Sequence, residues 1–171
     1  MPLMYPELNS QVSLSEPLPQ FVPGSACAQC DVCCRFPESD SFLRPYFTRE
    51  EIDAAVAQGL SPSLFMDPAG SQIALVKDAG SDGYLCPAFD PATSRCGIYE
   101  HRPLDCQLYP LALMWSEDGT RIELGWDTKC PFMRDAVPRD IQRHADQVLS
   151  LLQRESTHQI LSSNPRLIGR Y

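Results

Sequence analysis

Four cysteines lie within eight residues, in the stretch CAQCDVCC that runs from Cys27 to Cys34. Cys27, Cys30 and Cys33 are spaced at i, i+3 and i+6, so one tight loop can turn three sulfurs toward a common point. Ionised thiols in loops of this kind hold zinc or iron–sulfur clusters. A loop alone cannot keep that shape, so we expect ligands from elsewhere in the chain to complete the site.

The other four cysteines are widely spaced, and two of them precede a proline. Bacterial ferredoxins combine a Cys-x2-Cys-x2-Cys run with a further Cys-Pro pair, and either Cys86-Pro87 or Cys130-Pro131 could supply that pair. The second Cys-x2-Cys knuckle of a zinc ribbon is missing. We therefore expect an iron–sulfur cluster, a [4Fe–4S] cluster in particular, with zinc as the alternative and disulfides as a third reading. One cluster plus zinc, two clusters, or one site with spare thiols all agree with the number of cysteines.

The segment from Cys96 to Cys106 contains the residues expected to surround the ligands. Four thiolates around iron or zinc leave a net negative site, which a guanidinium would stabilise, and Arg102 is our candidate, with Tyr99 beside it. The alternative is a surface Arg102 paired with an acidic neighbour. His101 could be a ligand but is expected at the surface, and we expect His144 and His158 to be solvated.

Composition excludes two classes of partner. The chain has 171 residues, 43% of them hydrophobic, which is enough for one domain with a core. Its net charge of −8 opposes binding to nucleic acid or to an anionic membrane. We find no apolar run long enough to span a membrane and no secretory signal, so we expect a cytoplasmic protein, where clustered cysteines are more often metal ligands than disulfides.

The elements that must position the cysteines can be read in order. Residues 1–26 lack periodicity and predict an extended N-terminal arm. A capping box begins at Thr48 and predicts a short helix that ends at Gly59, and Ser61-Pro62 predicts one further turn. Residues 72–77 predict a strand, and residues 78–97 an irregular ligand loop.

Two stronger patterns follow. Apolar residues alternate from Leu108 to Trp126 around an Asp118-Gly119 turn, which predicts a β-hairpin that would bring Cys106 and Cys130 near each other. An apolar stripe predicts a helix over residues 139–154, and the segment after residue 163 is expected either to dock on the domain or to form a linker. These elements favour a single α+β domain over residues 27–171, with short helices, a small antiparallel sheet and irregular loops cross-linked by a metal centre.

The combined cysteine pattern resembles one known family, the YkgJ-type cysteine-cluster (CxxCxxCC) proteins. The resemblance covers residues 27–131 and includes Cys-Pro at 86 and the run Cys-x-Ile-Tyr-Glu-x-Arg-Pro-x2-Cys at 96–106, although Asp31 stands where many members have glycine. It implies chelation of zinc or iron, with no reaction attached, by eight ligands: Cys27, Cys30, Cys33, Cys34, Cys86, Cys96, Cys106 and Cys130. The flagellin lysine N-methylase is similar in its cysteine motif, which adds a cluster-dependent protein-modifying enzyme as a second hypothesis. A structural zinc module that binds another protein is the third.

Overall fold

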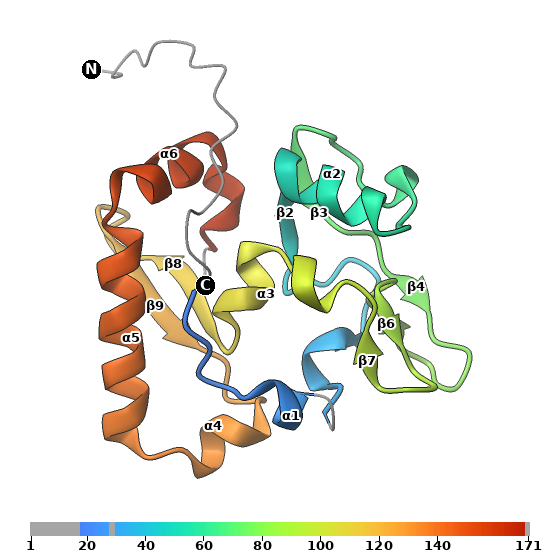
Figure 1. The fold of residues 1–171 in the computed structure, drawn as a ribbon, viewed down its shortest axis with the longest axis horizontal. Coiled ribbons are helices and arrows are strands. Elements are labelled where there is room, and N and C mark those ends of the chain that lie inside the picture. The colour runs from blue at the N-terminus through green and yellow to red at the C-terminus, as the bar shows by residue number, and fades with distance from the viewer. Residues whose placement is uncertain (1–17, 28–29, 170–171) are drawn as a thin grey trace.

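Most helices and strands of this chain are short (Figure 1). The structure is a computed structural model and describes residues 18–27 and 30–169. The α-helices are α1 (Gly24–Cys27), α2 (Arg49–Ala57), α3 (Leu104–Leu108), α4 (Pro131–Asp135), α5 (Pro138–Leu152) and α6 (Glu155–Ser163). The strands are β1 (Arg35–Phe36), β2 (Tyr46–Thr48), β3 (Gly70–Gln72), β4 (Val76–Lys77), β5 (Tyr84–Leu85), β6 (Phe89–Asp90), β7 (Arg95–Cys96), β8 (Leu111–Trp115) and β9 (Ile122–Trp126). Turns of 3-10 helix are η1 (Val32–Cys34), η2 (Pro62–Leu64), η3 (Tyr99–His101) and η4 (Pro165–Leu167).

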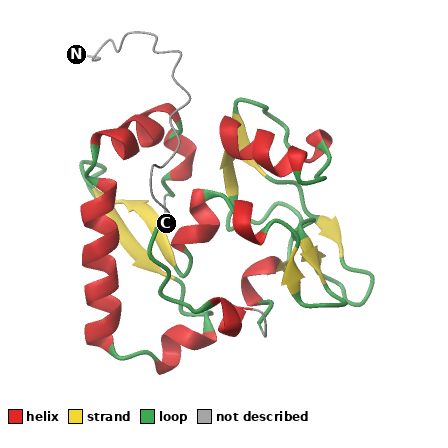
Figure 2. Cartoon of the chain, in the orientation of Figure 1, coloured by secondary structure: helices red, strands yellow, loops and turns green. Residues whose placement is uncertain are grey.

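The strands form four small antiparallel sheets. β5 lies between β1 and β4, and the other sheets are the pairs β2–β3, β6–β7 and β8–β9. Short helices beside small antiparallel sheets confirm the expected α+β class (Figure 2). Because most strands have only two or three residues, side-chain packing rather than long ladders must hold them in place.

The predicted capping box is present at the start of α2. The Thr48 hydroxyl accepts from the Glu51 N–H at 3.3 Å, and the Glu51 carboxylate accepts from the Thr48 N–H at 2.9 Å. The turn predicted at Ser61-Pro62 forms η2, with the Ser61 hydroxyl accepting from the Ser63 N–H. Both predictions are confirmed, since each depends only on residues close together in sequence.

The predicted hairpin is also confirmed. β8 pairs with β9 so that Leu111 faces Trp126, Leu113 faces Leu124 and Trp115 faces Ile122. The turn between them is closed by Asp118, whose carboxylate accepts from the Ser116 hydroxyl and from the N–H and hydroxyl of Thr120. The alternation of apolar residues therefore predicted both strands and also predicted which side chains lie on the same face of the hairpin.

The strand predicted over residues 72–77 is wrong as a single element. The structure has β3 and β4 instead, in different sheets. Ile73, fully buried, forms an isolated bridge to Phe65, and its N–H donates to the Pro45 carbonyl. This contact turns the chain from one sheet to the next. The loop predicted over residues 78–97 likewise contains β5, β6 and β7.

The C-terminal helix is confirmed as α5, and α6 follows it without having been predicted. The prediction that His144 is solvated is wrong: it is only 7% exposed and packs on Phe21 with ring centroids 5.1 Å apart. It shares the buried face of α5 with Val148 and Leu152. The segment after α6 docks, because Gly169 exchanges backbone hydrogen bonds with β8.

Three groups of buried apolar side chains hold these elements together. The hairpin cluster includes Leu108, Leu113, Val148 and Leu161, from α3, β8, α5 and α6. The sheet cluster packs α2 against the small sheets, and its members include Phe36, Phe47, Ile52, Ile73, Leu85, Phe89 and Ile98. The third, called here the small cluster, comprises Val22, Cys130 and Met133, with Phe21, Ala26, Cys27, Tyr109, Phe132 and Ile141 packed on them. In Figure 1 the hairpin with α5 and α6 forms one side of the molecule, α2 with β2 to β7 forms the other, and α3 lies between them.

Two further predictions concern the chain's ends and its relation to membranes. Residues 1–17 of the expected N-terminal arm lie outside the described residues, so the arm stays a prediction. Its last residues are described: Leu18 and Val22 are buried, and α1 begins at Gly24. Among the described helices, none is both long enough and apolar enough to cross a bilayer.

Candidate metal centre

All eight cysteines line one cavity of about 1550 Å³. They are Cys27, Cys30, Cys33, Cys34, Cys86, Cys96, Cys106 and Cys130. Each is a free thiol, so the disulfide reading finds no support in the structure. Cys86 and Cys130 are buried and Cys33 is the most open to solvent. Segments up to 103 residues apart in sequence therefore bring their cysteines to one cavity, as the metal hypothesis expects.

Short strands position Cys34, Cys86 and Cys96. β1 follows Cys34 directly and pairs with β5, which Cys86 follows, and the Cys86 N–H donates to the Cys34 carbonyl at 3.0 Å. The Phe89 N–H returns to the Cys86 carbonyl at 2.9 Å, and Phe89 faces Cys96 across the β6–β7 pair. One continuous set of backbone hydrogen bonds thus links these three cysteines, although 62 residues separate the first from the last.

The remaining cysteines lie in or near helices and 3-10 turns. Cys27 closes α1, and the Cys30 N–H donates to its carbonyl at 3.1 Å. Cys130 is the residue before α4 and packs with Cys27 in the small cluster. Cys106 lies within α3. Cys106 and Cys130, on either side of the hairpin, both line the cavity, but Cys106 does not pack in the small cluster.

Glu51 and Asp105 fix the position of α3. This helix has no side-chain cap of its own, and its first N–H, from Leu104, donates to the Glu51 carboxylate at 2.7 Å. Asp105 accepts from the Tyr46 N–H at 2.9 Å, which ties α3 to β2. Burial raises the pKa of Asp105 to about 6 and also raises that of Glu51. The helix that carries Cys106 is therefore held by two carboxylates from within the fold.

Burial is the main influence on most of the thiols. It raises the pKa of Cys86 to about 11, and it raises the pKa of Cys27, Cys96, Cys106 and Cys130 above the ordinary thiol value. A buried thiolate without a cation is costly, so these groups need a positive partner to ionise. A metal ion would supply that charge, and its binding would release protons.

Cys33 and Cys34 behave differently from the other thiols because they contact each other. Their sulfurs lie 3.9 Å apart, and the hydrogen bond between them lowers the pKa of Cys33 while raising that of Cys34. Two adjacent thiols on the cavity wall are therefore already in contact.

The predicted pair Arg102 and Tyr99 lies on the cavity wall. The Arg102 guanidinium stacks over the Tyr99 ring, 3.9 Å from its centroid, and donates to the Tyr99 carbonyl at 2.9 Å. Its charge lowers the pKa of Cys27, Cys33 and Cys96, although for Cys27 and Cys96 burial outweighs it. Among the described residues it forms no ion pair with an acidic neighbour. One cation thus faces thiols from two segments, where it can offset their negative charge.

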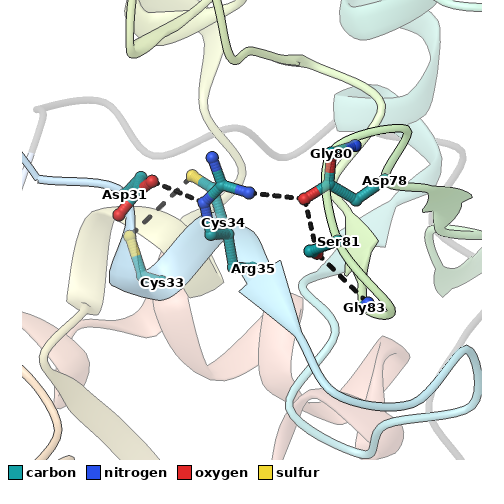
Figure 3. A network of polar contacts seen from close by, with 8 residues as sticks. All are labelled: Asp31, Cys33, Cys34, Arg35, Asp78, Gly80, Ser81 and Gly83. Carbon is teal, nitrogen blue, oxygen red and sulfur yellow. Dashed lines mark hydrogen bonds and ion pairs between the residues drawn. The ribbon is translucent and has the colours of Figure 1, made fainter.

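A polar network at the edge of the cavity, centred on Arg35, anchors the cysteine loop (Figure 3). Arg35 donates to Asp31 within the loop and, at 2.7 Å, to Asp78, which follows β4. Asp78 is 8% exposed and also accepts from Ser81 and from the Gly80 N–H. Sequence reasoning missed this network, because nothing near Arg35 or Asp31 points to a partner 43 residues later.

The donor set fits zinc or iron in kind, because both are bound by thiolates and the cavity presents eight. Histidine adds no visible donor: His101 is exposed and does not line the cavity. Across residues 18–27 and 30–169, however, no three Cys, His, Asp or Glu side chains are grouped closely enough to hold an ion. Metal binding would therefore have to bring the sulfurs closer together than they lie in this structure.

Comparison with known proteins supports the same chemistry. Residues 26–131, which include all eight cysteines, match the family model described as "CxxCxxCC: Putative zinc- or iron-chelating domain". No curated protein and no solved structure matches the chain. The matched segment covers more than half of the sequence, so this chain belongs to the CxxCxxCC family of zinc- or iron-chelating domains.

Proposed function

We propose that this protein binds metal through its eight cysteine thiolates and that it holds an iron–sulfur cluster, with zinc as the alternative occupant. The observation that carries this proposal is the meeting of all eight free thiols at one cavity. Inert structural cysteines would be scattered through the core as small apolar side chains, each with its own neighbours. Eight thiols around one space are instead the soft donor set that zinc and iron–sulfur clusters require.

The choice of iron–sulfur rests on local spacing. Cys27, Cys30 and Cys33 have the ferredoxin spacing, and Cys-Pro pairs are available to complete it. Four thiolates around either occupant leave a net negative charge, which Arg102 on the cavity wall would stabilise. In this proposal Cys33, whose pKa is already lowered, is the first ligand to ionise.

The test is a metal assay on protein purified without oxygen. Iron, acid-labile sulfide and zinc are measured on one sample, together with the visible absorption that iron–sulfur clusters give. We expect coloured protein with iron and sulfide in equal amounts. Colourless protein with stoichiometric zinc would overturn the iron–sulfur assignment and leave metal binding standing. Protein that takes up neither metal after reconstitution would overturn the whole proposal.

The cavity also favours a second candidate, a cluster-dependent enzyme. At about 1550 Å³ it is larger than most small-molecule sites, and its wall continues beyond the cysteines to Arg44, Tyr46 and Trp126. An enzyme of this kind needs room for a substrate beside its metal, as in the flagellin lysine N-methylase hypothesis. Chelation separates the roles: loss of fold indicates a structural centre, whereas a retained fold with a reducible cluster in the loaded protein indicates a catalytic or electron-transfer role.

A further inference from the structure

We infer that the eight thiols form two adjoining four-thiolate sites rather than one. The first site consists of Cys27, Cys30, Cys33 and Cys130. The second consists of Cys34, Cys86, Cys96 and Cys106. This inference rests on the proposed metal-binding function and assigns each cysteine within it.

Packing divides the cysteines between two walls of the cavity. Cys34, Cys86 and Cys96 pack with the sheet cluster, beside α2 and the short strands. Cys27 and Cys130 pack with the small cluster, between α1 and α4. Residues that belong to different packed cores cannot approach one ion without displacing those cores, which costs far more than a side-chain rotation. The five cysteines placed in this way already define two groups.

Backbone contacts give the same division. The hydrogen bond from Cys86 to Cys34 and the β6–β7 pair that contains Cys96 fix the second group through main-chain geometry. Cys30 is fixed to Cys27 by its own backbone hydrogen bond. Main-chain positions are held by the ladder whether or not a ligand is bound. The grouping is therefore a property of the fold.

Cys106 is assigned by its neighbours. α3 is tied to α2 through Glu51 and to β2 through Asp105, and α2 packs in the sheet cluster, although the buried residues of α3 itself pack in the hairpin cluster. Cys106 is absent from the small cluster, whereas Cys130 packs there with Cys27. We therefore assign Cys106 to the strand-held group and Cys130 to the loop group.

Cys33 stands at the boundary, because its sulfur contacts that of Cys34, a member of the second group. Its place at i+6 from Cys27 assigns it to the first site, where it completes the run of three. Cys130-Pro131 then supplies the ferredoxin-type fourth ligand, whereas Cys86-Pro87 is held on the other wall by Cys34. The 3.9 Å between the sulfurs of Cys33 and Cys34 makes the two sites neighbours.

The two sites differ in the chemistry they suit. The first has the spacing of a [4Fe–4S] ligand set. The second takes one ligand from each of four segments, next to β1, after β5, in β7 and in α3, so an ion bound there would cross-link them. Four thiolates with no open position are the donor set of a structural zinc ion. We therefore assign the cluster to the first site and a structural zinc ion to the second.

Paired substitutions in the full-length chain test the division. C27S/C130S removes two ligands from the first site, C86S/C96S removes two from the second, and C27S/C86S removes one from each. All three lack the same number of thiols, so each controls for the others. After reconstitution with ferrous iron, sulfide and zinc, we expect C27S/C130S to lose iron and sulfide by about tenfold or more and to keep its zinc, and C86S/C96S to do the reverse. C27S/C86S should lose both. Equal loss of both metals in all three variants would overturn the division.

The unaltered protein gives a second test that does not depend on a variant folding. Apo-protein is titrated with Cd²⁺, and thiolate-to-cadmium absorption and cadmium NMR are recorded. We expect saturation at two equivalents, with two tetrathiolate cadmium signals. Saturation at one equivalent would overturn the division while metal binding stands. No cadmium uptake, together with no iron or zinc, would instead refute the proposed function itself.

Discussion

Glu51 offers a sharp test of how the fold supports the metal centre. Its carboxylate accepts hydrogen bonds from two backbone N–H groups that lie far from each other in sequence. One belongs to Thr48 at the start of α2, and the other belongs to Leu104 at the start of α3. α3 carries Cys106, so a single side chain connects a local helix cap to the wall of the cavity. The substitution Glu51→Ala removes both hydrogen bonds at once.

The expected loss follows from these two contacts. A hydrogen bond to a charged group contributes about 1.5–3 kcal/mol, and each N–H left buried without a partner adds to the cost. Burial raises the pKa of Glu51, because desolvation opposes its ionised form. We therefore take about 1.5 kcal/mol, the lower end of the range, for each of the two hydrogen bonds. Glu51→Ala should then lower the free energy of unfolding by about 3 kcal/mol. Thr48→Ala, which removes only the local cap, should cost about 1 kcal/mol.

Urea unfolding of the metal-free protein at neutral pH measures these losses. Asp53→Ala is the matched control, because Asp53 is exposed on the same helix and its loss should change stability by less than about 0.5 kcal/mol. Metal-loaded Glu51→Ala should also release its metal to a chelator faster than the unaltered protein. A loss no greater than that of Thr48→Ala would refute the reasoning, because it would mean that the contact with Leu104 contributes nothing.

Three further predictions concern the hairpin, the core and the cysteine loop. Hydrogen bonds from Ser116 and Thr120 lower the pKa of Asp118 to about 2, so its ionised form stabilises the fold above its ordinary pKa of 3.8. The stability advantage over Asp118→Asn should therefore shrink between about pH 4 and pH 2, as urea unfolding of metal-free protein at each pH will measure. Ile73→Ala, at a fully buried position, should lower the free energy of unfolding by about 2–5 kcal/mol in the same assay. Arg35→Gln, which breaks the contacts with Asp31 and Asp78, should leave the circular dichroism spectrum unchanged but speed metal release to a chelator.

Each of these predictions has a control at an exposed residue. Glu117→Gln, exposed on the same turn as Asp118, should keep the pH dependence of the unaltered protein. Met66→Ala, at a residue 96% exposed, should leave stability within about 0.5 kcal/mol. Arg121→Gln, which removes an exposed ion pair in the hairpin, should leave metal release unchanged. A control that changes as much as its partner would contradict the contact assigned to that residue.

Local patterns predicted the elements whose interactions are local. The capping box at Thr48 and the alternation from Leu111 to Trp126 both depend on residues a few positions apart, and both formed as expected. The burial of His144 was missed, although the spacing i, i+4 to Val148 and on to Leu152 places it on the apolar face of α5. The helical spacing therefore already indicated that His144 is buried, but its polar side chain led to the opposite prediction.

The single strand expected over residues 72–77 failed for a different reason. Ile73 is held by Phe65 and by the Pro45 carbonyl, partners from two other segments, and these contacts divide the run into β3 and β4. No sequence pattern within residues 72–77 indicates these contacts. Tertiary contacts of this kind commonly override local β preference.

For the candidate site, the sequence by itself determined the donors: eight thiols, three of them at ferredoxin spacing, with an arginine and a tyrosine close by. Only the tertiary structure decided that all eight meet at one cavity, that Cys86 lies beside Cys34, and that Arg35 ties the loop to Asp78. The physical reason is the separation in sequence between the residues that interact. Helix caps and strand alternation are fixed by neighbours along the chain, whereas convergence of distant thiols depends on how separate cores pack against one another.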